Sequence, residues 1–244
     1  MTAKELFRAG HLTEAIQALG AELRENPTDA QRRTFLFELL CFAGDFDRAE
    51  KQLNVLADSS QETQMGAVLY HSALHAERLR QDLFSKRDWP DSSDPEPRAG
   101  TLNGKPFASL EDSDPRIGAR LELFAAGAYL WIPFEHITAI EMEKPKRLRD
   151  LLWIPALVRT GPSFRGTELG EVLLPVVSPF SWRHADGNVA LGRRTEWMED
   201  ETGEMVPYGQ KTFLVDDEDI AILEVRKLEF ASAETAEAAA DASP

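Results

Sequence analysis

One phrase occurs twice in this chain, as Gly10-His11-Leu12-Thr13-Glu14-Ala15 and, 34 residues later, as Gly44-Asp45-Phe46-Asp47-Arg48-Ala49. Leu19 and Leu53 extend the match, each four residues after the alanine. A period of 34 residues is that of tetratricopeptide (TPR) repeats, in which each unit is a pair of helices. The glycine opens a tight turn between two helices, and the small alanine lets the helices approach closely. Residues 1–84 are therefore predicted to form a TPR-like superhelix.

Apolar residues at helical spacing predict five helices in this region. They are expected near residues 2–8, 12–25, 29–43, 46–57 and 61–84. Two repeats fall short of the three or so that a solenoid usually needs, so the last helix is expected to cap them and the next domain to dock against them. A groove between such hairpins commonly takes a peptide by its apolar face. The alternative is that the repeat is only a spacer.

Residues 85–104 differ sharply in composition from the region before them. They are rich in Pro, Ser and Asp and poor in apolar residues, so they are predicted to form an extended linker. Trp89 is the exception, and we expect it to pin the linker onto a domain.

Alternation of apolar and polar residues replaces helical spacing over residues 105–231. Strands are predicted at 120–124, 129–132, 137–142, 155–159, 170–177, 188–198, 211–215 and 220–229, with one or two helical turns over 147–153. Many short strands with few helices favour a bent sheet or a partly open barrel. The fold class is therefore α+β and multidomain, ending in an Ala-rich acidic tail, 232–244, that is expected to be disordered.

The net charge of −15 excludes some classes of partner. A surface that follows nucleic-acid phosphates needs a basic face, and anionic membranes repel an acidic protein. Residues 1–84 carry a net charge of −4 and the remaining residues −11, so the acidity lies mostly in the second half. Basic or amphipathic peptides stay possible as partners, since charge speeds their encounter.

Cys41 is the only cysteine, so no internal disulfide or thiolate metal cluster is expected. The N-terminus lacks the apolar core of a signal peptide, and no run approaches the length of a membrane span. We therefore expect a cytoplasmic protein. The oligomeric state is left open.

The densest group of structurally demanding residues lies near the C-terminus. Two tryptophans, three arginines and two glycines occur in Pro179-Phe180-Ser181-Trp182-Arg183-His184-Ala185-Asp186-Gly187-Asn188-Val189-Ala190-Leu191-Gly192-Arg193-Arg194-Thr195-Glu196-Trp197. Asp-Gly-Asn is a turn signal, and arginine forks can hold carboxylates or backbone carbonyls at two points. Taken alone, the stretch predicts a hairpin whose arginines pin acidic loops, with Asp216-Asp217-Glu218-Asp219 as a candidate partner of the Arg193–Arg194 pair.

This stretch, together with Tyr208-Gly209-Gln210-Lys211-Thr212-Phe213, resembles the ImpE (TagJ) family, the accessory proteins of bacterial type VI secretion. The likeness covers essentially the whole chain. It implies a cytoplasmic binding protein that contacts the small subunit of the contractile sheath, through an amphipathic segment, and the ClpV ATPase that recycles the sheath. It implies no enzyme activity and no cofactor.

The candidate site is therefore a partner-binding or structural motif with no catalytic or metal-binding residue. Its members are Trp182, Arg183, Asp186, Gly187, Asn188, Gly192, Arg193, Arg194, Thr195, Glu196 and Trp197. We expect the partner at this loop or in the cleft between domains, because Trp and Arg dominate binding interfaces. One alternative is an enzyme whose three arginines hold an anionic substrate beside His184 or Asp186. Another is a passive subunit of a larger complex, marked by a large exposed apolar patch.

Other catalytic or metal-binding patterns are incomplete. His71 and His75 have a zinc-like spacing, but Ser72 stands where a zinc protease needs Glu. Residues 161–167 have the outer spacing of a phosphate loop without its lysine. The set Ser178, Ser181, His184 and Asp186 lacks a nucleophile elbow. Residues 216–219 lack the glycine and the spacing of a calcium loop.

Overall fold

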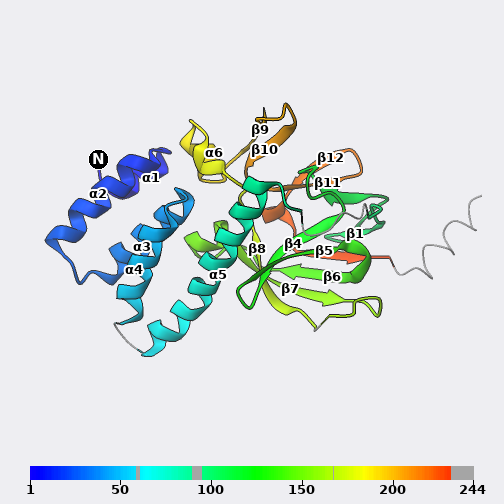
Figure 1. Cartoon of the computed structure of the whole chain (residues 1–244), viewed down its shortest axis with the longest axis horizontal. Coiled ribbons are helices and arrows are strands. Elements are labelled where there is room, and N and C mark those ends of the chain that lie inside the picture. Colours follow the sequence, from blue (N-terminus) through cyan, green and yellow to red (C-terminus); the bar gives the residue numbers. More distant parts are fainter. Residues whose placement is uncertain (59–60, 90–94, 167, 232–244) are drawn as a thin grey trace, which may run out of the picture.

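The first half of the chain forms the predicted helical repeat (Figure 1). In the computed structural model, which describes residues 1–58, 61–89, 95–166 and 168–231, the helices are α1 (Ala3–Arg8), α2 (Leu12–Glu25), α3 (Ala30–Phe42), α4 (Phe46–Ala57) and α5 (Gln61–Lys86). Gly10 and Gly44 adopt positive φ angles of 84° and 67° at the turns before α2 and α4, as only glycine does without strain. Ala15 and Ala49 are fully buried where the helices meet. The TPR-like prediction is confirmed.

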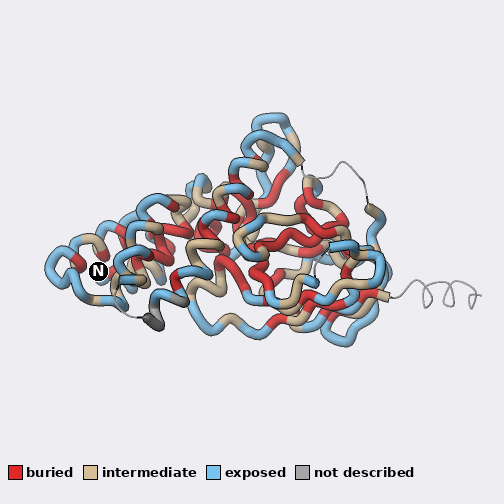
Figure 2. Tube along the Cα trace, turned by 60° about the horizontal axis from the view of Figure 1, so that its bottom comes forward, coloured by how far each residue is buried: buried red, intermediate tan, exposed pale blue. Residues whose placement is uncertain are grey.

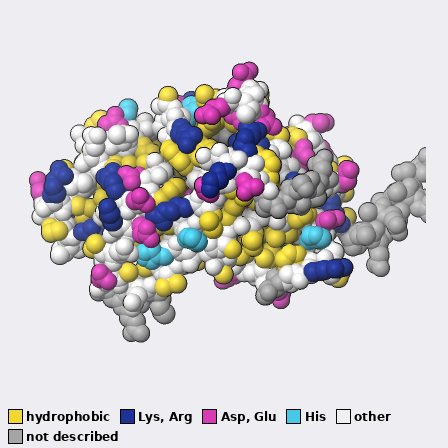
Figure 3. All heavy atoms as spheres, viewed as in Figure 1, with side chains coloured by type: hydrophobic (Ala, Val, Ile, Leu, Met, Phe, Trp, Pro, Cys, Tyr) yellow, Lys and Arg dark blue, Asp and Glu magenta, His cyan; other side chains and the backbone are white. Residues whose placement is uncertain are grey.

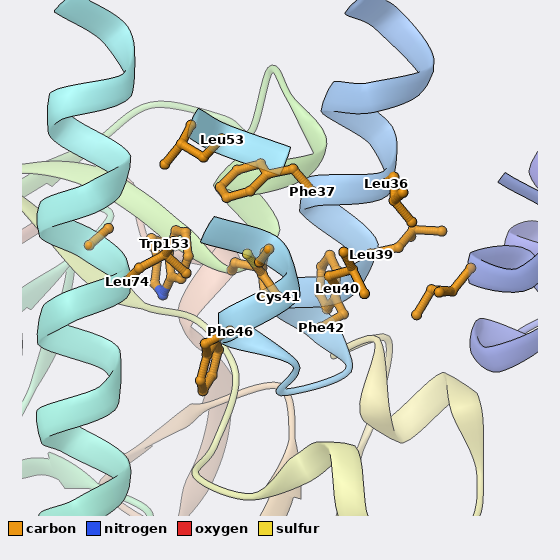
Figure 4. Packing of buried hydrophobic residues seen from close by; sticks show 14 of the residues in the cluster. Leu36, Phe37, Leu39, Leu40, Cys41, Phe42, Phe46, Leu53, Leu74 and Trp153 are labelled. Carbon is orange, nitrogen blue, oxygen red and sulfur yellow. The ribbon is translucent and has the colours of Figure 1, made fainter. Parts of the chain in front are cut away.

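The core of the repeat continues into the second half of the chain. Leu39, Leu40 and Leu74 belong to one buried apolar cluster with Trp153, from the first position of β7 in the sheet (Figure 4). Leu173, also from the sheet, belongs to the same cluster. The sheet thus covers apolar surface that a third repeat would otherwise bury. Helix α5 lies between the other helices and the sheet, in contact with both (Figure 1).

The second half builds an open antiparallel sheet of eight strands in the order β2-β1-β13-β6-β7-β8-β4-β5. Its strands are β1 (Gly100–Leu102), β2 (Lys105–Phe107), β4 (Arg120–Ala125), β5 (Ala128–Pro133), β6 (Ile137–Met142), β7 (Trp153–Thr160), β8 (Gly170–Pro175) and β13 (Lys227–Phe230). A second apolar cluster, which includes Leu123, Phe134 and Phe213, fills this half; Figure 2 shows how burial concentrates along its strands.

Two smaller sheets complete the fold. One has the order β12-β11-β3, with β3 (Leu110–Asp112), β11 (Thr212–Val215) and β12 (Glu218–Ala221). The other is a two-stranded ribbon of β9 (Thr195–Glu199) and β10 (Met205–Gly209). Short 3-10 helices link the strands: η1 (Phe134–His136), η2 (Leu148–Leu151), η3 (Ser181–Arg183) and η4 (Ile222–Glu224). Helix η2 confirms the helical turn expected over 147–153.

Two strand predictions were partly wrong. The strand predicted over 188–198 begins only at Thr195, because Asp186 caps Asn188 N–H at 2.7 Å and starts the short helix α6 (Gly187–Ala190). The strand predicted over 220–229 is interrupted by η4, so that its two parts join different sheets as β12 and β13. Alternation alone could not show either break.

The linker predicted over 85–104 is shorter than expected. Helix α5 continues to Lys86, and β1 pairs with β13 from Gly100 onward. A side chain on Gly100 would meet the Glu229 carbonyl oxygen at 2.2 Å, so glycine lets the two strands approach. Trp89 stacks on Trp131 with ring centres 5.8 Å apart, which gives the expected anchor. The tail at 232–244 lies outside the described residues.

Candidate functional site

The Arg/Trp segment, defined here as residues 180–197, lies against both glycine turns of the repeat. A Cβ atom on Gly44 would lie 2.5 Å from the Trp182 indole. One on Gly187 would lie 1.8 Å from the Gly10 carbonyl oxygen, and one on Gly10 would lie 2.9 Å from the Asn188 amide oxygen. The segment therefore touches the same position of each repeat, and both contacts depend on the absence of a side chain.

Trp182 provides the apolar part of this contact. Its ring meets Phe46, the first residue of α4, edge to face with centres 5.7 Å apart. Phe180 also meets the Trp182 ring edge to face, with centres 5.6 Å apart. Such aromatic pairs add about 0.5–1.5 kcal/mol beyond the area that they bury.

Arg193 provides the polar part. Its guanidinium donates to the Phe7 carbonyl at 2.6 Å and the Arg8 carbonyl at 3.0 Å, at the C-terminal end of α1. It also donates to the Asn188 side chain at 3.0 Å and lies 4.8 Å from the centre of the Phe7 ring. The carbonyls at a helix C-terminus attract a cation, and a planar fork can contact two of them at once. Arg193 thus ties the segment to the first helix.

The other two arginines are held within the segment itself. Arg194 pairs with Asp186 and, at 2.5 Å, with Glu196. Arg183 lies over the Phe180 ring, 4.2 Å from its centre. The expected pairing of Arg193–Arg194 with residues 216–219 is wrong: Asp216 instead accepts from the Ala108 and Ser109 amides, and it turns the chain between β11 and β12.

The polar residues of the enzyme alternative are not arranged as a catalytic set. Ser181 is fully buried, where it donates to the Ser178 carbonyl and accepts from Gly209 N–H, each at 2.7 Å. His184 accepts from Asp186 N–H at 3.1 Å and meets Glu196 at 3.0 Å. A groove of about 360 Å³ is lined by residues from 9–14 and 182–190, but by none of the three arginines. The arginines therefore do not converge on this groove.

Arg193→Ala is expected to destabilise the protein more than Arg194→Ala. Loss of the carbonyl contacts should cost about 1–2 kcal/mol, whereas the exposed Arg194 ion pairs contribute less than about 1 kcal/mol. Arg193→Lys should not restore the loss, because an ammonium lacks the two-point fork. Urea unfolding of the three variants would check the order; an equal loss for Arg193→Ala and Arg194→Ala would contradict it.

A buried charge cluster joins α5 to the sheet, and sequence analysis missed it. Arg80, 2% exposed, donates to both oxygens of Glu122 on β4 at 2.5 and 3.1 Å. Lys211 bridges Glu122 to Asp112, 2.6 Å away. Fork-shaped pairing of this kind fixes orientation as well as charge.

The cluster extends on the side of α5. Glu77 accepts from Arg80 at 3.1 Å and from the Trp153 indole at 3.0 Å, and Arg80 also reaches the Val177 carbonyl at 3.1 Å. Tyr129 donates to Glu122 at 3.0 Å. A single network thus connects the helix to four strands, β3, β4, β5 and β7, and to the chain that leads into the Arg/Trp segment.

Burial and pairing act in opposite directions on the carboxylates. Burial disfavours the charge on Glu122, but Arg80 and Lys211 outweigh it and lower its pKa to about 2. Burial raises the pKa of Asp112, because Lys211 alone cannot compensate for burial beside the carboxylates of Glu122 and Asp114. The pKa of Lys211 is raised by its two partners, against the effect of burial.

The sequence held one signal for this cluster. In Arg120-Leu121-Glu122-Leu123-Phe124 the alternation places Glu122 and Phe124 on the same face. A large apolar residue such as Phe124 on the face that would otherwise be polar indicates that both faces of this strand are covered. In the structure both faces are buried, and α5 lies on the side of Glu122 and Phe124. Glu122 then needs a buried partner, and Glu77 and Arg80 are one turn apart on α5.

Glu38 provides a pH test of the interface between halves. Burial raises its pKa to about 7, although Arg149 lies 3.7 Å away. An unfolded chain has a Glu pKa of about 4.3, so between the two values the folded protein binds more protons and loses stability as the pH rises. Glu38→Gln should reduce this decline by on the order of 1–3 kcal/mol. Urea unfolding at about pH 5 and pH 8 would measure it, and parallel curves for variant and wild type would contradict it.

The described residues show little that could hold a metal ion. No group of three or more His, Cys, Asp or Glu side chains is close enough among them. His71 lies 3.6 Å from Glu50, and His75 is exposed. Within the same residues, no helix is both long and apolar enough to cross a membrane.

Comparison with known proteins identifies both halves. A family described as "ImpE protein" matches residues 104–229, and a tetratricopeptide repeat family matches residues 6–69. The type VI secretion system accessory component TagJ of Pseudomonas aeruginosa is 31% identical to this chain over an aligned length of 267 residues, gaps included. The alignment covers 94% of this chain and 91% of that protein. A crystal structure of a Vibrio parahaemolyticus protein has the same fold, with a TM-score of 0.82, 22% identity, and coverage of 96% of this chain and 99% of the other.

Proposed function

This chain belongs to the ImpE family, and we propose that it acts as a non-enzymatic adaptor of type VI secretion. Its P. aeruginosa relative is named as an accessory component of that system. We propose further that it is cytoplasmic and that it binds an amphipathic segment of the sheath small subunit and the ClpV-type ATPase.

The contacts that the side chains of the Arg/Trp segment make support the proposal that the protein is an adaptor. Arg193 binds helix carbonyls, Arg194 binds carboxylates, and Trp182 packs on the second repeat turn. Trp182 and Arg193 hold the segment against the repeat, and the three arginines do not converge on the groove that His184 and Asp186 line. The alternative enzyme function, with a substrate at 182–197, therefore lacks a supporting arrangement.

A binding experiment with purified components tests the proposal. The full chain is needed, because one apolar cluster spans both halves. We expect the immobilised chain to bind purified sheath small subunit and purified ClpV-type ATPase in separate measurements. Small subunit that lacks its amphipathic segment is the control, and it should not bind. Absence of binding to both proteins would overturn the proposal, as would turnover of a small molecule that Arg194→Ala abolishes.

A further inference from the structure

The β9–β10 ribbon exposes large apolar side chains. Trp197 is 38% exposed and Met205 is 46% exposed. Residues opposite each other in an antiparallel pair lie on the same face, and the register pairs Trp197 with Pro207 and Glu199 with Met205. One face of the ribbon is thus apolar along its length with a carboxylate at its outer end.

This face forms one wall of a groove, called here the ribbon groove. It has a volume of about 600 Å³ and lies between the ribbon, the chain at 95–97 and the loop after β3. Prolines and Leu214 supply most of its remaining apolar lining: Pro95, Pro97, Pro115 and Leu214. An exposed Trp beside Met and Pro is the kind of surface that anchors a partner side chain.

The charges of the ribbon groove are all of one sign. Glu96, Glu111 and Asp112 line it, and its described lining contains no Lys or Arg. Asp112 is buried and paired with Lys211, but neither Glu96 nor Glu111 forms an ion pair within the described part of the chain. Glu199 is likewise unpaired there.

At the nearby tip of the ribbon, carboxylates of the same kind form ion pairs with an arginine. Arg87 donates to Asp200 at 2.8 Å and to Glu204 at 2.6 Å and thereby ties the tip to the end of α5. Acidic side chains gather over this tip in Figure 3. The groove below it has carboxylates of the same kind without an arginine of the described chain.

We propose that the ribbon groove docks a basic peptide segment of a partner protein, one that presents Lys or Arg to the groove carboxylates and an apolar side chain to Trp197. Opposite charge favours such a segment and excludes acidic ones, and a partner guanidinium can also lie over the indole. The inference adds a binding surface to the proposed adaptor function, and it rests on that function because it takes the partner to be a protein.

A synthetic peptide provides the direct test. The probe is a labelled short peptide of alternating Arg and Leu, and its matched control has Glu in place of each Arg. Fluorescence anisotropy with the full chain should show binding of the Arg peptide alone. The double variant Glu96→Lys/Glu111→Lys should weaken this binding by about tenfold or more.

A second double variant controls for net charge. Glu25→Lys/Glu171→Lys alters the charge by the same amount at exposed sites away from the groove, and it should bind like wild type. Trp197→Ala should also weaken binding, whereas Leu79→Ala, which removes a side chain that is 44% exposed, should not. Melting temperatures would show that each variant is folded.

The proposal would be overturned by no binding of the Arg peptide, by equal binding of the Glu peptide, by equal loss in both double variants, or by self-association that Trp197→Ala abolishes. The last would show that a second copy occupies the groove. If the Glu96→Lys/Glu111→Lys variant binds the peptide, the sheath subunit and the ATPase as tightly as wild type, the groove assignment fails and the adaptor function stands. If wild type binds neither the sheath subunit nor the ATPase, the adaptor proposal fails, and the peptide assay still shows whether the ribbon groove binds a basic segment.

Discussion

Arg80→Ala is expected to lower the free energy of unfolding by about 3–5 kcal/mol, the cost of leaving a buried carboxylate without its partner. Arg80 is the only cation that contacts both Glu77 and Glu122 among the described residues. Its removal leaves Glu122 with Lys211 and leaves Glu77 without an ion pair to any cation in the described part of the chain. Because the network joins α5 to the sheet, the loss should loosen the contact between the two halves.

Urea unfolding followed by circular dichroism would measure this effect. Arg78→Ala is the matched control: it lies on the same helix and pairs with Asp47 and Glu50, but it is partly exposed. Its loss should cost no more than about 1 kcal/mol. Equal destabilisation by the two substitutions would show that burial of the network contributes nothing to stability.

Gly187→Ala is expected to destabilise the protein by about 1–3 kcal/mol, the usual cost of forcing a methyl group into filled space. The new Cβ would lie 1.8 Å from the Gly10 carbonyl oxygen. This oxygen belongs to the backbone of a tight turn, so relief requires the Arg/Trp segment to move away from the repeat. Contacts of Arg193 with α1 should weaken at the same time.

Gly20→Ala provides a control of opposite sign. Gly20 lies inside α2, and nothing lies within 4 Å of the Cβ that it would gain. The substitution should stabilise the protein by about 0.5–1 kcal/mol, because alanine favours a helix more than glycine does. Hydrogen exchange at α1 would show where the Gly187→Ala variant opens. Unchanged stability and protection in that variant would refute the contact.

The helical half could be predicted closely from the sequence. The 34-residue period, the glycine turns and, in α2 and α4, the helical spacing of apolar residues are local signals that need no information from distant parts of the chain. The strands were predicted less well. The Asp186 cap replaced extended chain by α6, and η4 divided one predicted strand between two sheets, since pairing depends on residues distant in sequence.

The candidate site was found in the sequence, but its role was left open between partner binding and a structural lock. The structure places Gly187, Asn188 and Arg193 against the first repeat turn and α1, and Trp182 against the second turn. Trp197 takes no part in the contact with the repeat and instead lines the ribbon groove. The residues that the motif brings together in sequence therefore lie at two surfaces.

The sequence by itself determined the repeat, the α+β class and the membership of the ImpE family, because these depend on short-range patterns and on the motif's residue types. Only the tertiary structure decided which residues meet across the two halves. Arg80 and Glu122 are 42 residues apart, and Arg193 reaches Phe7 across 186. No local pattern encodes such pairs, since a buried charge looks like a surface charge until the fold places another element over it.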